Sequence, residues 1–119
     1  MIIRFGVASD VNDALLKIKG AIAKGRFDIV PRAKNNTGLT ELGLTRETLK
    51  ELICEFTHKN YCSGPEEDRD RPGSGEIWLY GEDVNGIEAY IKIKIYEIDS
   101  EVYAKCISIH PAAHPMNYK

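Results

Sequence analysis

Six side chains in the second half of the sequence have the chemical types needed to transfer protons and bind phosphate. They are Tyr90, Lys92 and Lys94 on one predicted strand, His110 at the end of another, and Arg69 and Arg71 before the first strand. Cleavage of RNA by its own 2′-hydroxyl needs a base, an acid and fixed cations that stabilise the pentavalent phosphorane. Histidine suits the proton transfer because it titrates near neutral pH. The set therefore predicts such cleavage, with Tyr90 and His110 in proton transfer and the four cations on phosphate. A solvated strand face would carry the same tyrosine and lysines.

Three further patterns indicate other chemistry. His110 and His114 have the spacing of a metal pair on a helix, but a proline follows each and no third ligand lies nearby in the sequence. We therefore expect no metal site and no cofactor. Cys62 beside His58 has the types of a thiol nucleophile and its base, although a plain loop thiol is the simpler interpretation. Gly73-Ser74-Gly75 lacks the lysine and the following helix of a phosphate-binding loop.

Length and composition place the chain in an ordinary class. Its 119 residues, 43% of them hydrophobic, fit a single domain over 1–119. The net charge of −2 excludes the broad basic coat of a non-specific nucleic-acid binder, but it allows a local cationic site. Three cysteines without a CxxC pair suit a reducing interior. No apolar run approaches the roughly 18–20 residues of a membrane span, and the first residues lack the features of a signal peptide. We expect a cytoplasmic protein.

Two amphipathic helices are predicted in the first half of the chain. Residues 10–24 bring apolar side chains to one face at three- and four-residue spacing, with Ser9 or Asp10 as the cap and Gly25 at the end. Residues 45–56 form the second helix, capped by Thr45. The intervening residues 26–43 are expected to form a connector with one short helical turn.

The second half of the chain changes to a period of two. Residues 57–75 contain several glycines, prolines and charges and predict a long loop. Strands follow at 76–83, 87–97 and 102–109, joined by a hairpin turn at Asn85-Gly86 and a second turn at Asp99-Ser100. The pattern predicts an α+β fold, with two main helices packed on a three-stranded, or slightly larger, antiparallel sheet. The face on which His110 lies depends on the register of the third strand, since a slip of one residue reverses it.

Several short motifs resemble a bacterial group of toxins from type II toxin–antitoxin systems. They are Glu41-Leu42-Gly43-Leu44-Thr45, Gly64-Pro65-Glu66-Glu67-Asp68-Arg69-Asp70, Glu76-Ile77-Trp78, Tyr90-Ile91-Lys92-Ile93-Lys94 and Cys106-Ile107-Ser108-Ile109-His110-Pro111. Across roughly residues 10–119 the chain is similar to the motility quorum-sensing regulator (MqsR) family. This resemblance implies a RelE-like fold, metal-independent mRNA endoribonuclease activity and an antitoxin partner encoded beside it.

The resemblance also implies roles for particular positions. The strand tyrosine of the family falls on Tyr90, and its catalytic lysine in the last strand falls on His110. The loop lysine falls on Cys62, and the glutamine after the strand tryptophan falls on Leu79. We therefore expect a toxin-type endoribonuclease that acts on mRNA, free or on the ribosome. The alternative is a non-catalytic binding module of the same fold that holds a protein partner.

Overall fold

The computed structural model describes residues 10–119. Ser9, one of the two predicted caps of the first helix, lies outside the described residues. The elements are α1 (Val11–Ala23), β1 (Phe27–Ile29), α2 (Ala33–Leu42), α3 (Arg46–Cys54), a 3-10 turn η1 (His58–Asn60), β2 (Tyr61–Glu67), β3 (Glu76–Val84), β4 (Ile87–Ile98) and β5 (Glu101–Pro111). The α+β class is confirmed. None of the helices in this range is long and apolar enough to cross a membrane.

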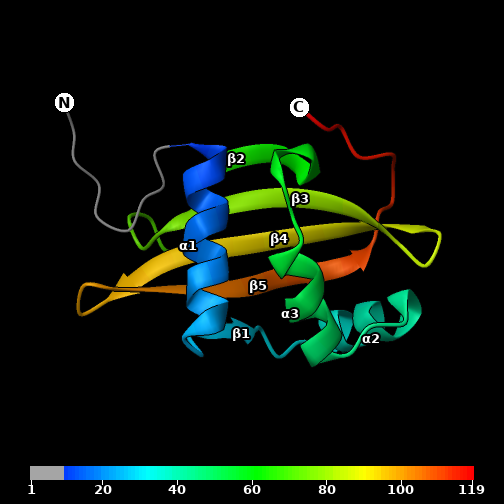
Figure 1. The fold of residues 1–119 in the computed structure, drawn as a ribbon, viewed down its shortest axis with the longest axis horizontal. Helices are drawn as coiled ribbons and strands as arrows, with labels where there is room; N and C mark the ends of the chain where they lie inside the picture. Colours follow the sequence, from blue (N-terminus) through cyan, green and yellow to red (C-terminus); the bar gives the residue numbers. More distant parts are fainter. Residues whose placement is uncertain (1–9) are drawn as a thin grey trace.

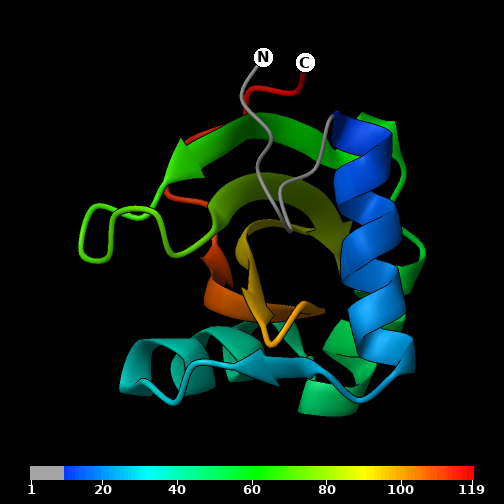
Figure 2. The same cartoon turned by 90° about the vertical axis from the view of Figure 1, so that its left-hand side faces the viewer.

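The five strands form one mixed sheet in the order β1-β5-β4-β3-β2. β1 runs parallel to β5, while the other neighbouring strands are antiparallel. Helices α1 and α3 lie across one face of this sheet (Figure 1). The loop between β2 and β3 projects on the side away from α1 (Figure 2). We call the face opposite α1 and α3 the open face.

The two predicted main helices form because their caps and apolar spacing agree. Asp10 accepts a hydrogen bond from the Asp13 amide at the start of α1, and Leu15 and Ile18 are buried on its inner face. Thr45 and Thr48 cap α3 reciprocally through side chain and backbone.

The core lies between these helices and the sheet. Its largest buried side chains are Trp78 and Tyr80 of β3, Phe56, and the isoleucines at 91, 93 and 95 of β4. The alternating pattern of β4 therefore places its isoleucines inward, as predicted. Asn85 and Gly86 both adopt positive φ in the hairpin that joins β3 to β4, which fixes their pairing.

Three predictions about the connecting segments and the sheet were wrong. The sheet has five strands and is mixed, whereas the prediction was a three-stranded, or slightly larger, antiparallel sheet. Residues 26–43 contain β1 and the ten-residue helix α2 instead of a single turn, and residues 57–75 contain η1 and β2, which leaves a loop of only 68–75. β1 is three residues long and pairs with distant β5, so no local periodicity marks it. β2 contains Gly64-Pro65, which is tolerated because β2 is an edge strand.

Candidate functional site

Tyr90 and His110 lie side by side on the open face. They are direct partners in the β4–β5 ladder, and their ring centres are 4.7 Å apart with planes inclined by 12°. The register that the sequence could not fix thus brings the two predicted proton-transfer residues together.

His110 reaches this face because β5 contains a bulge. Lys92 pairs with Ser108 and the next residue of β4 pairs with Cys106, so Ile107 is an extra residue on β5. Before the bulge Cys106 is buried with even-numbered Ala104, whereas after it Ile109 is buried and His110 faces outward. A regular strand would have placed His110 toward the helices.

A buried side chain of α2 forms hydrogen bonds with backbone groups of β5 at and beside the bulge. Asn35, which is 2% exposed, donates from Nδ2 to the carbonyls of Val30 (2.9 Å) and Ile107 (3.0 Å). Its Oδ1 accepts from the Ile109 amide at 3.1 Å. Gly38, one turn further along α2, lies so close to β5 that a Cβ there would stand 1.9 Å from the Ile109 carbonyl oxygen. Asn35 and Gly38 thus hold the strand just before His110.

The imidazole of His110 is oriented by its own neighbour. Its Nδ1 lies 2.7 Å from the carbonyl oxygen of Pro111. A carbonyl can only accept a hydrogen bond, so Nδ1 carries the proton in this contact. In the neutral ring Nε2 is then the basic nitrogen, which is the state that a general base requires.

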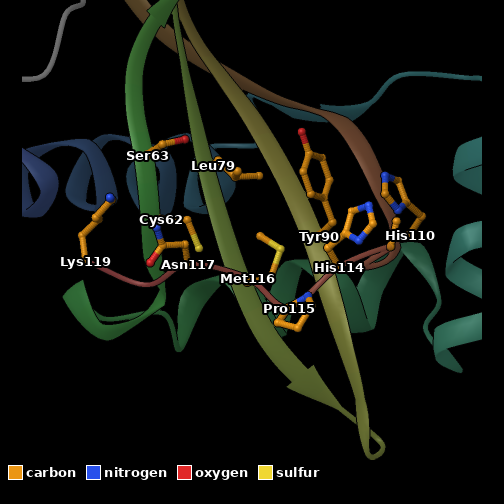
Figure 3. Close-up of a pocket in the computed structure, with 11 residues that line it drawn as sticks. Cys62, Ser63, Leu79, Tyr90, His110, His114, Pro115, Met116, Asn117 and Lys119 are labelled. Carbon is orange, nitrogen blue, oxygen red and sulfur yellow. The ribbon is translucent and has the colours of Figure 1, made fainter.

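The stacked pair lines a cavity of about 410 Å³ that the segment 112–119 closes from one side. Figure 3 shows Tyr90, His110 and His114 gathered at one end of this cavity, with Met116 and Cys62 toward the other. Glu88 anchors the segment, since its carboxylate accepts hydrogen bonds from the Met116 amide (2.9 Å) and the Tyr118 hydroxyl (2.8 Å). Burial and this contact with Glu88 raise the pKa of Tyr118. No periodic pattern in residues 112–119 marks this wall of the cavity.

A second, polar groove of about 580 Å³ adjoins the cavity on the open face. Lys92, Arg69 and Arg71 line it, and so do Arg32 and Lys105, which the sequence analysis did not single out. Tyr90 and Lys92 border the small hollow that lies between the groove and the cavity. The open face therefore carries the Tyr90–His110 pair and, in the adjoining groove, several cations together with the carboxylates of Glu66, Glu67, Asp68 and Asp70.

Lys94 also lines the groove, but its ammonium is bound inside the protein. The residue is 3% exposed, and its Nζ donates to Asp68 Oδ2 and to Ser74 Oγ, each at 2.7 Å. The hydrogen bond from Lys94 holds the pKa of the Asp68 carboxyl below its ordinary value. Lys94 thus fastens the loop 68–75 to β4.

The alternative chemistries find less support in the geometry. Cys62 lies in β2 and is buried, which raises the pKa of its thiol and disfavours the reactive thiolate. His58 lies in η1 and does not line the cavity. His110 and His114 line the same cavity, yet residues 10–119 contain no group of three or more His, Cys, Asp or Glu side chains that could hold a metal ion.

No protein family, curated protein or solved structure matches the chain.

Proposed function

We propose that the chain is a toxin of the MqsR type with a RelE-like fold, a metal-independent endoribonuclease that cleaves mRNA. The observation that carries the proposal is the stacked Tyr90–His110 pair beside a polar groove in which cations outnumber carboxylates. A phenol, an imidazole with a free Nε2 and several fixed cations are the groups that this chemistry requires. The motif resemblance described above supports the same activity.

In the proposed step, Nε2 of His110 takes the proton of a ribose 2′-hydroxyl. The oxygen attacks the adjacent phosphorus, the bond from phosphorus to the 5′-oxygen breaks, and the Tyr90 hydroxyl protonates that leaving oxygen. The products are a 2′,3′-cyclic phosphate and a 5′-hydroxyl. Lys92, whose Nζ lies 5.8 Å from the centre of the Tyr90 ring, is placed to stabilise the charge on the phosphorane.

Phosphate contacts away from the scissile bond are assigned to Arg69 and Arg71 on the loop 68–75. Both side chains are exposed, and bidentate guanidinium groups suit phosphate oxygens. Lys94 would act on phosphate only if an anion replaced Asp68 as its partner, so its main contribution is to hold that loop.

The proposal includes two partners. The substrate is mRNA, free or on the ribosome. A cognate antitoxin protein would inhibit the activity in the cell. The protein would act in the cytoplasm. Expression of the intact protein alone should then slow growth, and His110→Ala should relieve that effect while the protein stays folded.

A second candidate function is a catalytically silent module that binds a protein partner. Two positions favour it, because the family lysine and glutamine fall on Cys62, which is buried, and Leu79, which is apolar and lines the cavity. Harmless expression of the intact, folded protein would support this candidate over the toxin.

The direct test is single-turnover digestion of an unstructured RNA in the presence of EDTA. Tyr90→Phe keeps the ring but removes the hydroxyl, so the rate should fall on the order of 10²–10⁴-fold, the usual contribution of general acid–base catalysis. Tyr80→Phe, which removes a hydroxyl buried in the core, is the matched control and should cleave like the parent. Cleavage that EDTA abolishes, or a Tyr90→Phe protein as active as the parent, would contradict the assigned roles.

A further inference from the structure

A second aromatic pair lies on the open face, toward the turn between β4 and β5. Tyr96 and Tyr103 are direct partners in the ladder, with ring centres 5.7 Å apart and planes inclined by 26°. Both side chains are only half-buried. They are set in the same way as Tyr90 and His110, one from β4 and one from β5.

Cations accompany this pair as well. Lys105 Nζ lies 5.0 Å from the centre of the Tyr96 ring, and the Arg26 guanidinium carbon lies 5.7 Å from that of Tyr103. Arg26 is also paired with Glu101 at 2.5 Å, whereas Lys105 additionally lines the polar groove. Lys105 is therefore the cation of this cluster that is placed to meet a phosphate.

The two aromatic pairs lie at opposite ends of the polar groove, whose lining includes cations and also the carboxylates of Glu66, Glu67, Asp68 and Asp70. Tyr90 and Tyr96 are six residues apart in β4, which at about 3.3 Å per residue corresponds to about 20 Å. Lys92, Lys105 and the loop arginines line the groove between them. Aromatic side chains that stack bases, joined by a groove of cations that follows the backbone, are the features of proteins that bind single-stranded nucleic acid.

We infer that Tyr96 and Tyr103, with Lys105, form a second base-stacking site for single-stranded RNA, distinct from the Tyr90–His110 site. A stacked strand advances about 3.4 Å per nucleotide, so the two sites are at most about six nucleotides apart along the RNA. This inference rests on the proposed function only for the identity of the strand as RNA. It assigns the substrate class, an unpaired stretch long enough to contact both aromatic pairs.

The test is fluorescence-anisotropy binding of two labelled oligonucleotides, of three and eight nucleotides, carrying 2′-O-methyl groups so that they cannot be cleaved. Tyr96→Leu should weaken binding of the eight-nucleotide strand by about 5- to 150-fold, the fold-change that corresponds to about 1–3 kcal/mol of stacking. Binding of the three-nucleotide strand at the Tyr90–His110 end should not change. Tyr96→Phe, which retains the ring, should bind both strands like the parent.

A second measurement does not disturb the aromatic packing. Lys105→Gln should reduce the slope of log affinity against log salt by about 0.7, the value for one phosphate contact to a single strand. Lys50→Gln on α3, across the sheet from the open face, is the matched control and should leave the slope unchanged. Equal affinity of the parent and a folded Tyr96→Leu protein for the eight-nucleotide strand, with an unchanged slope in Lys105→Gln, would overturn the inference.

The outcome is separable from that of the proposed function. Binding that depends on Tyr96 in a protein that cleaves no RNA would uphold the stacking site and refute the endoribonuclease. If the protein cleaves RNA but Tyr96→Leu does not change its affinity for the eight-nucleotide strand, the endoribonuclease would be supported and the stacking site refuted.

Discussion

Replacing Asn35 by alanine should reveal how much stability the β5 bulge draws from one side chain. The substitution removes three hydrogen bonds. The Val30 carbonyl retains another donor, the Arg32 amide at 2.9 Å, so two groups lose their side-chain partner: the Ile107 carbonyl and the Ile109 amide. A buried polar group without a partner costs about 1–3 kcal/mol. We expect a loss of about 3 kcal/mol, near the lower end for two such groups, because water can enter the space that the side chain leaves.

Asn36→Ala supplies the matched control. Asn36 is the next residue of α2 and is exposed, and its contact with Thr40 uses the backbone carbonyl, which the substitution keeps. Both substitutions change helix propensity equally, so the difference between the two proteins isolates the buried hydrogen bonds. At about 2.1 cal/mol/K per residue of unfolding entropy, a loss of 3 kcal/mol lowers the melting temperature by about 12 °C.

The assay is urea denaturation of both variants, followed by a proton NMR spectrum of the His110 ring. Asn35→Ala should unfold at lower urea, and the His110 resonances should lose the ring-current shift caused by Tyr90 as β5 loosens. Stability of Asn35→Ala within 1 kcal/mol of Asn36→Ala would refute the claim that Asn35 maintains the bulge.

The remaining predictions concern the hydrogen bonds of Lys94 to the loop 68–75, and the thiols. Lys94→Met should release this loop and make trypsin cleave it several-fold faster, whereas Lys92→Met on the same strand should not. Equal cleavage rates in the two variants would contradict the claim that Lys94 holds the loop. Because Lys94 lowers the Asp68 pKa below its ordinary 3.8, the stabilisation by this carboxylate should be complete above about pH 3.8 and be lost as the pH falls through the lowered value. Urea denaturation of the parent against Asp68→Asn should show their difference shrinking at low pH; a constant difference would rule this out. Iodoacetamide at neutral pH should alkylate exposed Cys54 and leave buried Cys62 unmodified, as peptide mass spectrometry can check; equal labelling would contradict the burial that raises the pKa of the Cys62 thiol.

Sequence reasoning succeeded where local signals and tertiary packing agree. The strict alternation of β4 and the Asn85-Gly86 turn predicted the β3–β4 pairing, and the capped amphipathic pattern predicted α1 and α3. It failed for α2, whose sequence Ala33–Leu42 contains two asparagines, two threonines and a glycine, all weak helix formers. That helix is stabilised by contact with β5 through Asn35 and Gly38, which only the folded chain supplies.

In the candidate site as well, residues placed by strand periodicity were predicted correctly, and residues placed by tertiary contacts were not. Tyr90 and Lys92 were predicted on the open face because strand periodicity places them there. Lys94 has the same parity, but the loop 68–75 covers it, and no local pattern foretells where a loop folds back. The position of His110 depends on one extra residue at Ile107, since a bulge reverses the alternation of a strand.

The place of β5 within the sheet has a consequence for the kinetics of folding. β5 lies between β4, its neighbour in sequence, and β1, whose Phe27 pairs with Ala104. The β3–β4–β5 meander closes only short loops, so it can form early. β1 can pair only after β5 has formed, and this pairing closes a long loop. We expect substitutions in β4 and β5 to slow folding, and substitutions in α2 mainly to accelerate unfolding. The bulge and the orientation of His110 would then be fixed only in the last stage, when Asn35 docks.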